Sequence, residues 1–188
     1  MNQVEKILTE TGALLTGHFR LTSGRHGAQY MQCAKVLQYP EHTAHIAQVL
    51  AEGFKDENID IVLAPAIGGI VLGYELARAL GAKSLFAERE DGKMTLRRGF
   101  EIPKGARVIV AEDVVTTGGS TREVMAIAEE HGADIAGVCI MVDRTGGQLD
   151  FGVKLVSAYS KAIVSYDPDE CPLCKEGLPV VKPGSRNI

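Results

Sequence analysis

Residues 108–121, with the sequence VIVAEDVVTTGGST, decide the fold expected of this chain. The stretch begins with three β-branched apolar residues, which is typical of a parallel strand buried on both faces. Two adjacent carboxylates, Glu112 and Asp113, come where this strand should end. Neighbouring carboxylates repel each other and gain nothing structurally without a partner. The pair therefore indicates a ligand site rather than ordinary turn chemistry.

A short polar loop and a helix are expected directly after the acids. The loop covers 116–119, and Ser120 with Glu123 has the spacing of a capping box that opens a helix. Loop amides and a helix dipole favour a phosphate group, while the acids can accept hydrogen bonds from vicinal ribose hydroxyls. The sequence therefore predicts a sugar-phosphate site, and it contains neither the P-loop nor the Rossmann signature.

The rest of the chain repeats the order strand, loop, helix. Strands are expected over 59–64, 84–87, 135–142 and 155–159, and helices over 2–11, 40–55, 70–80 and 120–131. This alternation is typical of an α/β fold with a central parallel sheet flanked by helices. Less regular patterns at 14–38 and 168–188 predict small strands and a tail outside that sheet. We expect one domain over 1–188.

Composition narrows the class of protein. The 188 residues are 45% hydrophobic and 23% charged, as in an ordinary globular protein. A formal net charge of −4 argues against general binding to nucleic acid or to anionic membranes. The first residues lack the pattern of a signal peptide, and no apolar run is long enough to span a bilayer. We expect a cytoplasmic protein with neither nucleic acid nor membrane as partner.

Two of the four cysteines form the pair Cys171-Pro-Leu-Cys174. This spacing occurs in zinc ribbons and in redox motifs, but a ribbon needs a second pair of cysteines, which the chain lacks. We therefore expect reduced, structural cysteines and no metal held by protein ligands. Metal binding or redox chemistry is the alternative for this pair.

Three further segments could contribute to the site. The glycine loop 65–69 follows one expected strand, and Arg144 follows another. In open α/β sheets, ligands bind beyond the carboxyl ends of the strands. An exposed salt bridge is the alternative for Arg144. Residues 88–100 interleave cations with acids, which predicts either a solvated hairpin or a mobile lid that brings positive charge to a leaving group.

Residues 108–121 resemble the phosphoribosyl diphosphate (PRPP) motif of type I phosphoribosyltransferases, in which a strand, two acids, two apolar residues, Thr, a small residue and Gly follow in this order. The resemblance implies the type I phosphoribosyltransferase fold, with a small N-terminal hood over about 1–40 and a mobile lid loop. It also implies that 65–69 binds the pyrophosphate group. Further PRPP contacts are implied for Arg89, Lys93, Glu112, Asp113, Val114, Val115, Thr116, Thr117, Gly118, Gly119 and Ser120.

Two other segments are similar to one branch of the orotate phosphoribosyltransferases. They are the pattern ERxxGxMxLRRGF at 88–100 and the sequence LTSGRH at 21–26. The similarity implies catalytic roles for Arg89, Lys93 and Asp113. It implies orotate contacts from Arg25, Tyr30, Thr116 and Arg144. The enteric branch of that family has lysines where this chain has Thr22, Gly68 and Glu90, so those lysine contacts are not expected here.

The implied reaction transfers ribose 5-phosphate from PRPP to orotate, giving orotidine 5′-phosphate and diphosphate in pyrimidine nucleotide (UMP) synthesis. Mg²⁺ is expected as a cofactor bound mainly through the phosphates. A homodimer is also implied, in which the lid of one subunit closes over the site of the other. A purine phosphoribosyltransferase and a non-catalytic PRPP-sensing regulator are the alternatives, and the regulator would need a nucleic-acid-binding face that the acidic composition disfavours.

Overall fold

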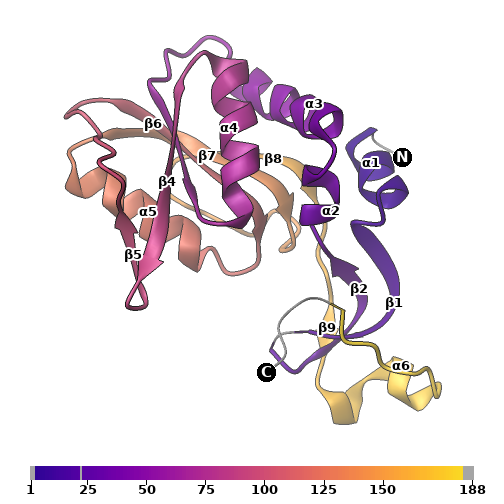
Figure 1. Cartoon of the computed structure of the whole chain (residues 1–188). Helices are drawn as coiled ribbons and strands as arrows, with labels where there is room; N and C mark the ends of the chain where they lie inside the picture. Colours follow the sequence, from indigo (N-terminus) through magenta and orange to yellow (C-terminus); the bar gives the residue numbers. More distant parts are fainter. Residues whose placement is uncertain (1–2, 22, 184–188) are drawn as a thin grey trace.

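Six strands form the central sheet of the computed structural model, which describes residues 3–21 and 23–183 (Figure 1). In spatial order they are β5 (Lys93–Leu96), β4 (Lys83–Glu90), β3 (Ile61–Pro65), β6 (Arg107–Val115), β7 (Asp134–Asp143) and β8 (Lys154–Ser160). All neighbours are parallel except β4 and β5, which form an antiparallel hairpin at one edge. The expected α/β sheet is therefore confirmed.

Helices cover both faces of this sheet. α3 (Pro40–Ala51) and α4 (Gly68–Leu80) lie on one face, and α5 (Gly119–Glu130) lies on the other (Figure 1). Because successive side chains of a strand point to opposite faces, Val62 of β3 packs with α3 and α4 while Leu63 packs with α5. No helix in the described part of the chain has the length and apolar character needed to cross a membrane.

The start of α5 differs from the expectation. β6 continues through both acids to Val115 instead of ending before them. Gly118 stands directly before α5 with a φ of 79°, a left-handed conformation that suits glycine, and no side chain caps this end of the helix. The expected capping box of Ser120 and Glu123 is wrong, because Glu123 forms an ion pair with Arg89 instead.

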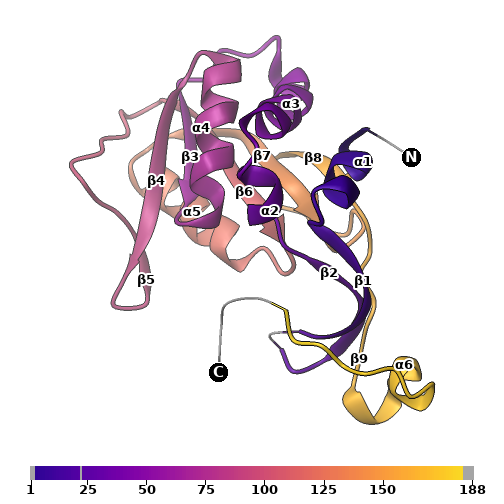
Figure 2. The same cartoon turned by 45° about the vertical axis from the view of Figure 1, so that its right-hand side comes forward.

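Two strands from the irregular segment 14–38, and one strand that the sequence did not predict, form a second, smaller sheet. β1 (Leu14–Arg20), β2 (His26–Met31) and β9 (Ser165–Tyr166) pair antiparallel in the order β1-β2-β9. From here on, the hood means β1 and β2 alone, and the tail means residues 161–183. Figure 2 shows both extending away from the central sheet.

The remaining elements are short. They are α1 (Gln3–Glu10), α2 (Ala34–Leu37), α6 (Pro172–Lys175) and the 3₁₀ turns η1 (Glu52–Phe54) and η2 (Pro168–Glu170). α1 buries Val4, Ile7 and Leu8 against the core, as the spacing of these apolar residues predicts. Residues 1–2, 22 and 184–188 lie outside the described part of the chain, so the expected helix start at Asn2 and the position of Thr22 are not assessed.

The polar segment at 88–100 contains most of the β4–β5 hairpin. β4 extends to Glu90, beyond the expected strand at 84–87, and a turn at 91–92 leads into β5. Met94 is buried in the core on the α5 side of the sheet although its neighbours are polar. Met94, together with the pairing of β5 to β4, therefore attaches to the sheet edge a segment whose polar residues predict a solvated loop.

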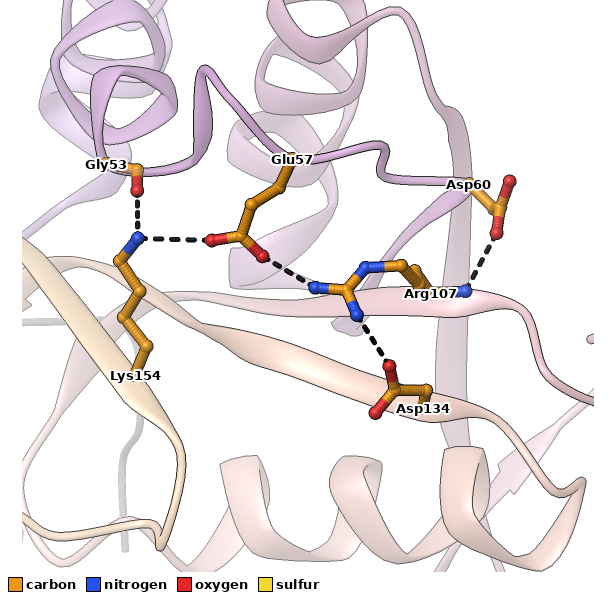
Figure 3. Close-up of polar contacts among 6 residues, drawn as sticks. All are labelled: Gly53, Glu57, Asp60, Arg107, Asp134 and Lys154. Atoms are coloured by element: carbon orange, nitrogen blue, oxygen red, sulfur yellow. Dashed lines mark hydrogen bonds and ion pairs between the residues drawn. The ribbon is translucent and has the colours of Figure 1, made fainter.

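The amino ends of the strands carry a network of paired charges (Figure 3). Arg107, which begins β6, donates hydrogen bonds to Glu57 at 2.6 Å and to Asp134 at 2.7 Å. Lys154, which begins β8, donates to Glu57 at 3.2 Å, and Asp60 accepts a hydrogen bond from the Arg107 amide at 2.8 Å. Hydrogen bonds from Lys154 and Arg107 lower the pKa of Glu57. The chain itself thus supplies partners for the charges of this network.

Candidate functional site

A cleft of about 260 Å³ opens over the carboxyl end of β6 and the N-terminus of α5. Its walls contain Arg89, Glu112, Val114, Val115, Thr116, Thr117, Gly118, Gly119, Ser120, Thr121 and Glu123. Nine of the eleven residues expected to contact PRPP therefore lie together in this cleft. The two others, Lys93 and Asp113, lie outside its walls.

The N-terminus of α5 supplies the cleft with amide groups. The first amides of a helix have no acceptor within the helix, and the helix dipole makes this end positive. Gly118 allows the preceding loop to turn tightly, because a side chain there would lie 2.9 Å from the ring of Phe151. The loop at 116–118 and the first turn of α5 together form a concave surface suited to a phosphate group.

The two acids of β6 belong to opposite faces of the strand. Glu112 lines the cleft on the α5 side, whereas Asp113 lies against Gly68 at the start of α4. Burial, and then the neighbouring charge of Asp113, raises the pKa of Glu112 from 4.5 to about 8. Burial also raises the pKa of Asp113. A ligand that supplies hydroxyl donors or positive charge here would relieve both penalties.

Gly68 leaves room for the Asp113 carboxylate. A Cβ atom at position 68 would lie 2.6 Å from Asp113 Oδ1 and 2.8 Å from Oδ2. No side chain fits there unless the carboxylate moves. The glycine loop 65–69 and Asp113 thus form one continuous edge of the site.

A second group of side chains lies on the hood side of Asp113. The Cys33 thiol donates to the Asp113 carbonyl at 3.5 Å, and burial, followed by the charge of Asp113, raises its pKa. The Arg144 guanidinium is close enough to Cys33 and Tyr30 to interact with both electrostatically. Its Nε is buried and has no hydrogen-bond partner within the described residues. An unpaired buried donor is costly, so Arg144 is suited to a carboxylate or carbonyl acceptor from a ligand.

Asp143 holds the loop that carries Arg144. Its carboxylate accepts hydrogen bonds from the amides of Thr145 and Gly147, both at 2.7 Å, and from the Ser160 hydroxyl at 2.8 Å. Burial raises the pKa of Asp143, but these hydrogen bonds outweigh it and the net shift is downward. The Arg144 amide also donates to the Val115 carbonyl at 3.0 Å, which ties the ends of β6 and β7 together.

The hairpin cations have partners that sequence reasoning did not identify. Arg89 donates to the Gly92 carbonyl at 2.8 Å and forms an ion pair with Glu123 of α5 at 2.5 Å, which places it in the cleft. Its hairpin neighbours pair among themselves, Arg97 with Glu90 and Arg98 with Glu88. Lys93 is exposed and forms no ion pair with any residue in the described ranges.

Arg25 and Tyr30, both expected to contact orotate, are placed differently. Arg25 donates to Ser165 Oγ at 2.9 Å and to Asp167 at 2.8 Å, so its guanidinium holds the tail onto the hood. The Arg25 guanidinium is thus already paired within the protein, and its expected contact with orotate stays a prediction. Tyr30 lies half-buried near Arg144, and its hydroxyl donates to Gln32 at 3.1 Å.

Sequence reasoning missed three residues of the site: Cys33, Glu123 and Asp143. Cys33 has no neighbouring motif that indicates its contact, since its partner lies on β6. Asp143 bonds mainly to Thr145 and Gly147 of its own loop, so the short polar sequence that follows it was the available signal. Glu123 was assigned to a cap because its spacing from Ser120 is also that of a capping box. Only the position of Arg89 across the cleft distinguishes the two roles.

Comparisons with known proteins agree with this geometry. A family model described as phosphoribosyl transferase domain matches residues 33–151. The chain is 52% identical over 187 residues to an orotate phosphoribosyltransferase of Pelotomaculum thermopropionicum, covering 100% of this chain and 98% of that protein. It is 54% identical over 183 residues to one of Caldicellulosiruptor saccharolyticus, covering 97% and 96%. A crystal structure of orotate phosphoribosyltransferase from Aeropyrum pernix superposes with a TM-score of 0.72 at 29% identity, covering 84% of this chain and 93% of that one.

Proposed function

We propose, since this chain belongs to the orotate phosphoribosyltransferase family within the phosphoribosyltransferases, that it transfers the ribose 5-phosphate group of PRPP to orotate. The products are orotidine 5′-phosphate and diphosphate. The observation that carries the proposal is the cleft at the N-terminus of α5 with the two acids of β6, both of raised pKa, at its edge. An anion site beside two carboxylates whose charged form is disfavoured by burial suits a molecule that carries phosphate and vicinal hydroxyls together.

The two faces of β6 suggest how PRPP lies. The 5′-phosphate binds the amides of 116–120 on the α5 side, and the ribose crosses the end of the strand so that its hydroxyls donate to Glu112 and Asp113. The diphosphate then lies against the loop 65–69. This orientation is supported by the contact between Gly68 and Asp113, which makes loop and acid adjacent.

The base binds on the hood side in this proposal. The Arg144 guanidinium donates to the carboxylate or to a carbonyl of orotate, which satisfies the buried Nε. Tyr30 lies against the pyrimidine ring, and Thr116 contacts the base from the other side. Orotate N1 attacks the anomeric carbon as the bond to the diphosphate oxygen breaks. No covalent intermediate with a side chain is required.

The leaving diphosphate concentrates negative charge, and Mg²⁺ on its oxygens would neutralise that charge as a Lewis acid. Glu112 and Asp113 fit an auxiliary role toward this ion, because both are carboxylates whose ionised form is disfavoured by burial. Two carboxylates are too few to enclose Mg²⁺, which keeps several waters and prefers phosphate oxygens. Arg89 lies on the phosphate side, and Lys93 is free to reach the diphosphate.

We propose that the protein acts as a homodimer. Ile67, Val71 and Tyr74 are 85%, 44% and 62% exposed and recur at helical spacing on one side of α4 and its preceding loop. A second copy of the chain would cover this apolar face in a twofold arrangement. Arg89 lines the cleft of its own chain. The part of the lid shared between subunits is therefore the tip of the hairpin, where Lys93 begins β5.

The test of activity is the loss of orotate absorbance in the presence of PRPP and Mg²⁺. We expect turnover with orotate and none with adenine, guanine or hypoxanthine at the same concentration. Identity above 50% over the full length to orotate phosphoribosyltransferases favours this outcome over a purine specificity. Turnover of a purine base without turnover of orotate would contradict the proposal, and binding of PRPP without any turnover would favour the regulator.

The shared lid is tested by mixing two inactive variants, Lys93→Ala and Asp113→Asn. A hybrid dimer has one site with a wild-type lid and a wild-type acid pair. Random exchange makes half of the dimers hybrid, so about a quarter of wild-type activity should return. If subunits exchange but no activity returns, Lys93 acts within its own subunit.

A further inference from the structure

Four potential metal ligands meet where the tail packs on the hood. They are the rings of His18 on β1 and His26 on β2, and the thiols of Cys171 and Cys174 at α6. One ligand atom from each residue lies within 4.8 Å of all the others. We expected no metal at the cysteine pair because the chain has no second pair of cysteines. The fold brings two histidines into that place, from positions 153 and 148 residues away along the chain.

The spacing of these atoms fits a tetrahedral ion. His18 Nε2 lies 3.5 Å from Cys171 Sγ and 3.7 Å from Cys174 Sγ, and His26 Nδ1 lies 3.3 Å from Cys174 Sγ. A tetrahedral Zn²⁺ with ordinary bond lengths separates nitrogen and sulfur by about 3.5 Å and two nitrogens by about 3.3 Å. The two ring nitrogens are 2.9 Å apart, so a small outward movement completes the tetrahedron.

A backbone carbonyl fixes His18 in the tautomer that can bind a metal through Nε2. Its Nδ1 lies 2.8 Å from the Leu178 carbonyl, which can only accept a hydrogen bond. The proton is therefore on Nδ1, and Nε2 presents its lone pair to the thiols and to His26. A backbone carbonyl that fixes the far nitrogen of a histidine is the usual arrangement beside a bound metal.

The tail is shaped around its two cysteines. Cys171 precedes α6 and Cys174 lies within this single turn, so both thiols project from one side of it. The amides of Lys175 and Gly177 donate to the carbonyls of Cys171 and Cys174 at 3.2 and 3.0 Å. Both thiols are free rather than joined in a disulfide, and Cys171 is completely buried.

This end of the molecule has little else to hold it together. The two core clusters of the described chain contain no residue of the tail, and Leu178, Val180 and Val181 are each about half exposed. Beyond the cluster, the hydrogen bonds of the tail include the short pairing of β9 with β2, those of Arg25 to Ser165 and Asp167, and two backbone bonds at Val181. The start of the tail also bonds to the end of β7 and the loop after it, through the amides of Lys161 and Ile163. A small unit without an apolar core ordinarily needs a metal or a disulfide.

We propose that His18, His26, Cys171 and Cys174 bind one Zn²⁺ ion, which fastens the tail to the hood. Two thiolates and two imidazoles in tetrahedral array select zinc over magnesium or calcium. Four protein ligands leave no open coordination position, so the ion has a structural role and does not take part in phosphoribosyl transfer. The site is independent of the activity proposed above.

Metal content of tag-free protein, purified under reducing conditions and equilibrated with ZnCl₂ before desalting, tests the proposal. We expect about one zinc per chain in the wild type and less than about a fifth of that in Cys174→Ser and in His18→Asn. Cys139→Ala and His131→Asn are the matched controls, since each removes a thiol or an imidazole elsewhere, and both should retain the full amount. Cys174 is exposed, so its substitution does not disturb the core.

Cobalt provides a second measurement that does not depend on activity. Co²⁺ added to the zinc-free protein should give the intense visible bands of a tetrahedral thiolate complex, and Cys174→Ser should lack them. Removal of zinc should also speed proteolytic cleavage of the tail. Wild-type protein without stoichiometric zinc, or zinc that stays at full occupancy in Cys174→Ser and His18→Asn, would overturn the proposal.

Discussion

Charged side chains at the two ends of the central sheet differ in whether the protein supplies their partners. At the amino ends of the strands, Arg107 and Lys154 are paired with Glu57 and Asp134, and all four side chains are partly exposed (Figure 3). At the carboxyl ends, Glu112 is buried and Asp113 is half-buried, and the pKa of each is raised. There Arg144 Nε has no partner among the residues that the structure describes.

This difference separates residues that hold the fold from residues kept for a ligand. An exposed ion pair contributes about 0.2–1 kcal/mol to stability, and its charges are satisfied before any ligand arrives. A buried acid without a cation, or a buried guanidinium nitrogen without an acceptor, weakens the free protein. Such groups are consistent with a site in which the missing partners come from PRPP and orotate.

The largest effect is expected from Asp113→Asn. Because Asp113 is proposed to interact with ribose hydroxyls and Mg²⁺, turnover should fall by about 100-fold or more. The melting temperature should stay the same or rise slightly, since the substitution removes a buried charge. Asp134→Asn makes the same chemical change at the other end of the sheet and should leave turnover intact. Steady-state kinetics and thermal melts of the two variants test this prediction. Equal losses of turnover in both variants would contradict the proposed difference between the two ends of the sheet.

Arg144→Ala should weaken orotate binding more than PRPP binding. Loss of a charge-assisted hydrogen bond costs about 1.5–3 kcal/mol, which corresponds to a rise in the KM for orotate of about 10- to 100-fold. The KM for PRPP should change less than threefold. Arg78→Ala, which removes an exposed arginine paired with Glu75, is the control. If the KM for PRPP changes more than the KM for orotate, Arg144 lies on the phosphate side of the site.

The raised pKa of Glu112 predicts how stability depends on pH. Between its ordinary value of 4.5 and about 8, Glu112 binds more protons in the folded state than in the unfolded state. Its contribution to stability is therefore fully present below pH 4.5 and is lost as the pH rises through about 8. The melting temperature of the ligand-free protein should fall by about 5 °C between pH 6 and pH 9 from this group. Glu112→Gln should flatten the curve, and an unchanged slope in that variant would contradict the assignment.

The smallest effect is expected from Arg107→Gln. The variant loses two partly exposed ion pairs, so the free energy of unfolding should fall by about 1 kcal/mol and the melting temperature by about 2–4 °C. Turnover should be unchanged at temperatures well below the melting temperature. A large loss of turnover in the fully folded variant would show that the two ends of the sheet are coupled.

The fold was predictable because its signals are local. Apolar runs predicted the five parallel strands of the sheet but not β5, and glycines such as Gly81 predicted helix ends. The course of β6 through Glu112 and Asp113 was not predictable, since acids seldom lie within a buried strand. The start of α5 directly after Gly118 could not be predicted either. Ser120 and Glu123 have the spacing of a capping box, and only the fold places Arg89 beside Glu123.

The part of the site formed by one continuous stretch of sequence was predictable. The part formed by residues from separate segments was not. Glu112 and residues 114–120 line one cleft, as the PRPP motif implies, while Asp113 lies on the other face of the strand. The neighbourhood of Arg144, Cys33 and Tyr30 depends on packing between hood and sheet, for which no motif exists. The same holds for His18 and His26 beside the cysteine pair. Arg25 shows the opposite case, because its sequence context matches the family while its side chain holds the tail.

The most direct test of the contrast between the two ends is the thermal shift caused by PRPP with Mg²⁺. Saturation at about 100 times the Kd stabilises a protein by about 2.7 kcal/mol, which should raise the melting temperature of the wild type by about 5–10 °C. Asp134→Asn should show the same rise, and Asp113→Asn should show less than half of it. An equal rise in Asp113→Asn and the wild type would contradict the claim that the buried acids at the carboxyl end exist to bind PRPP.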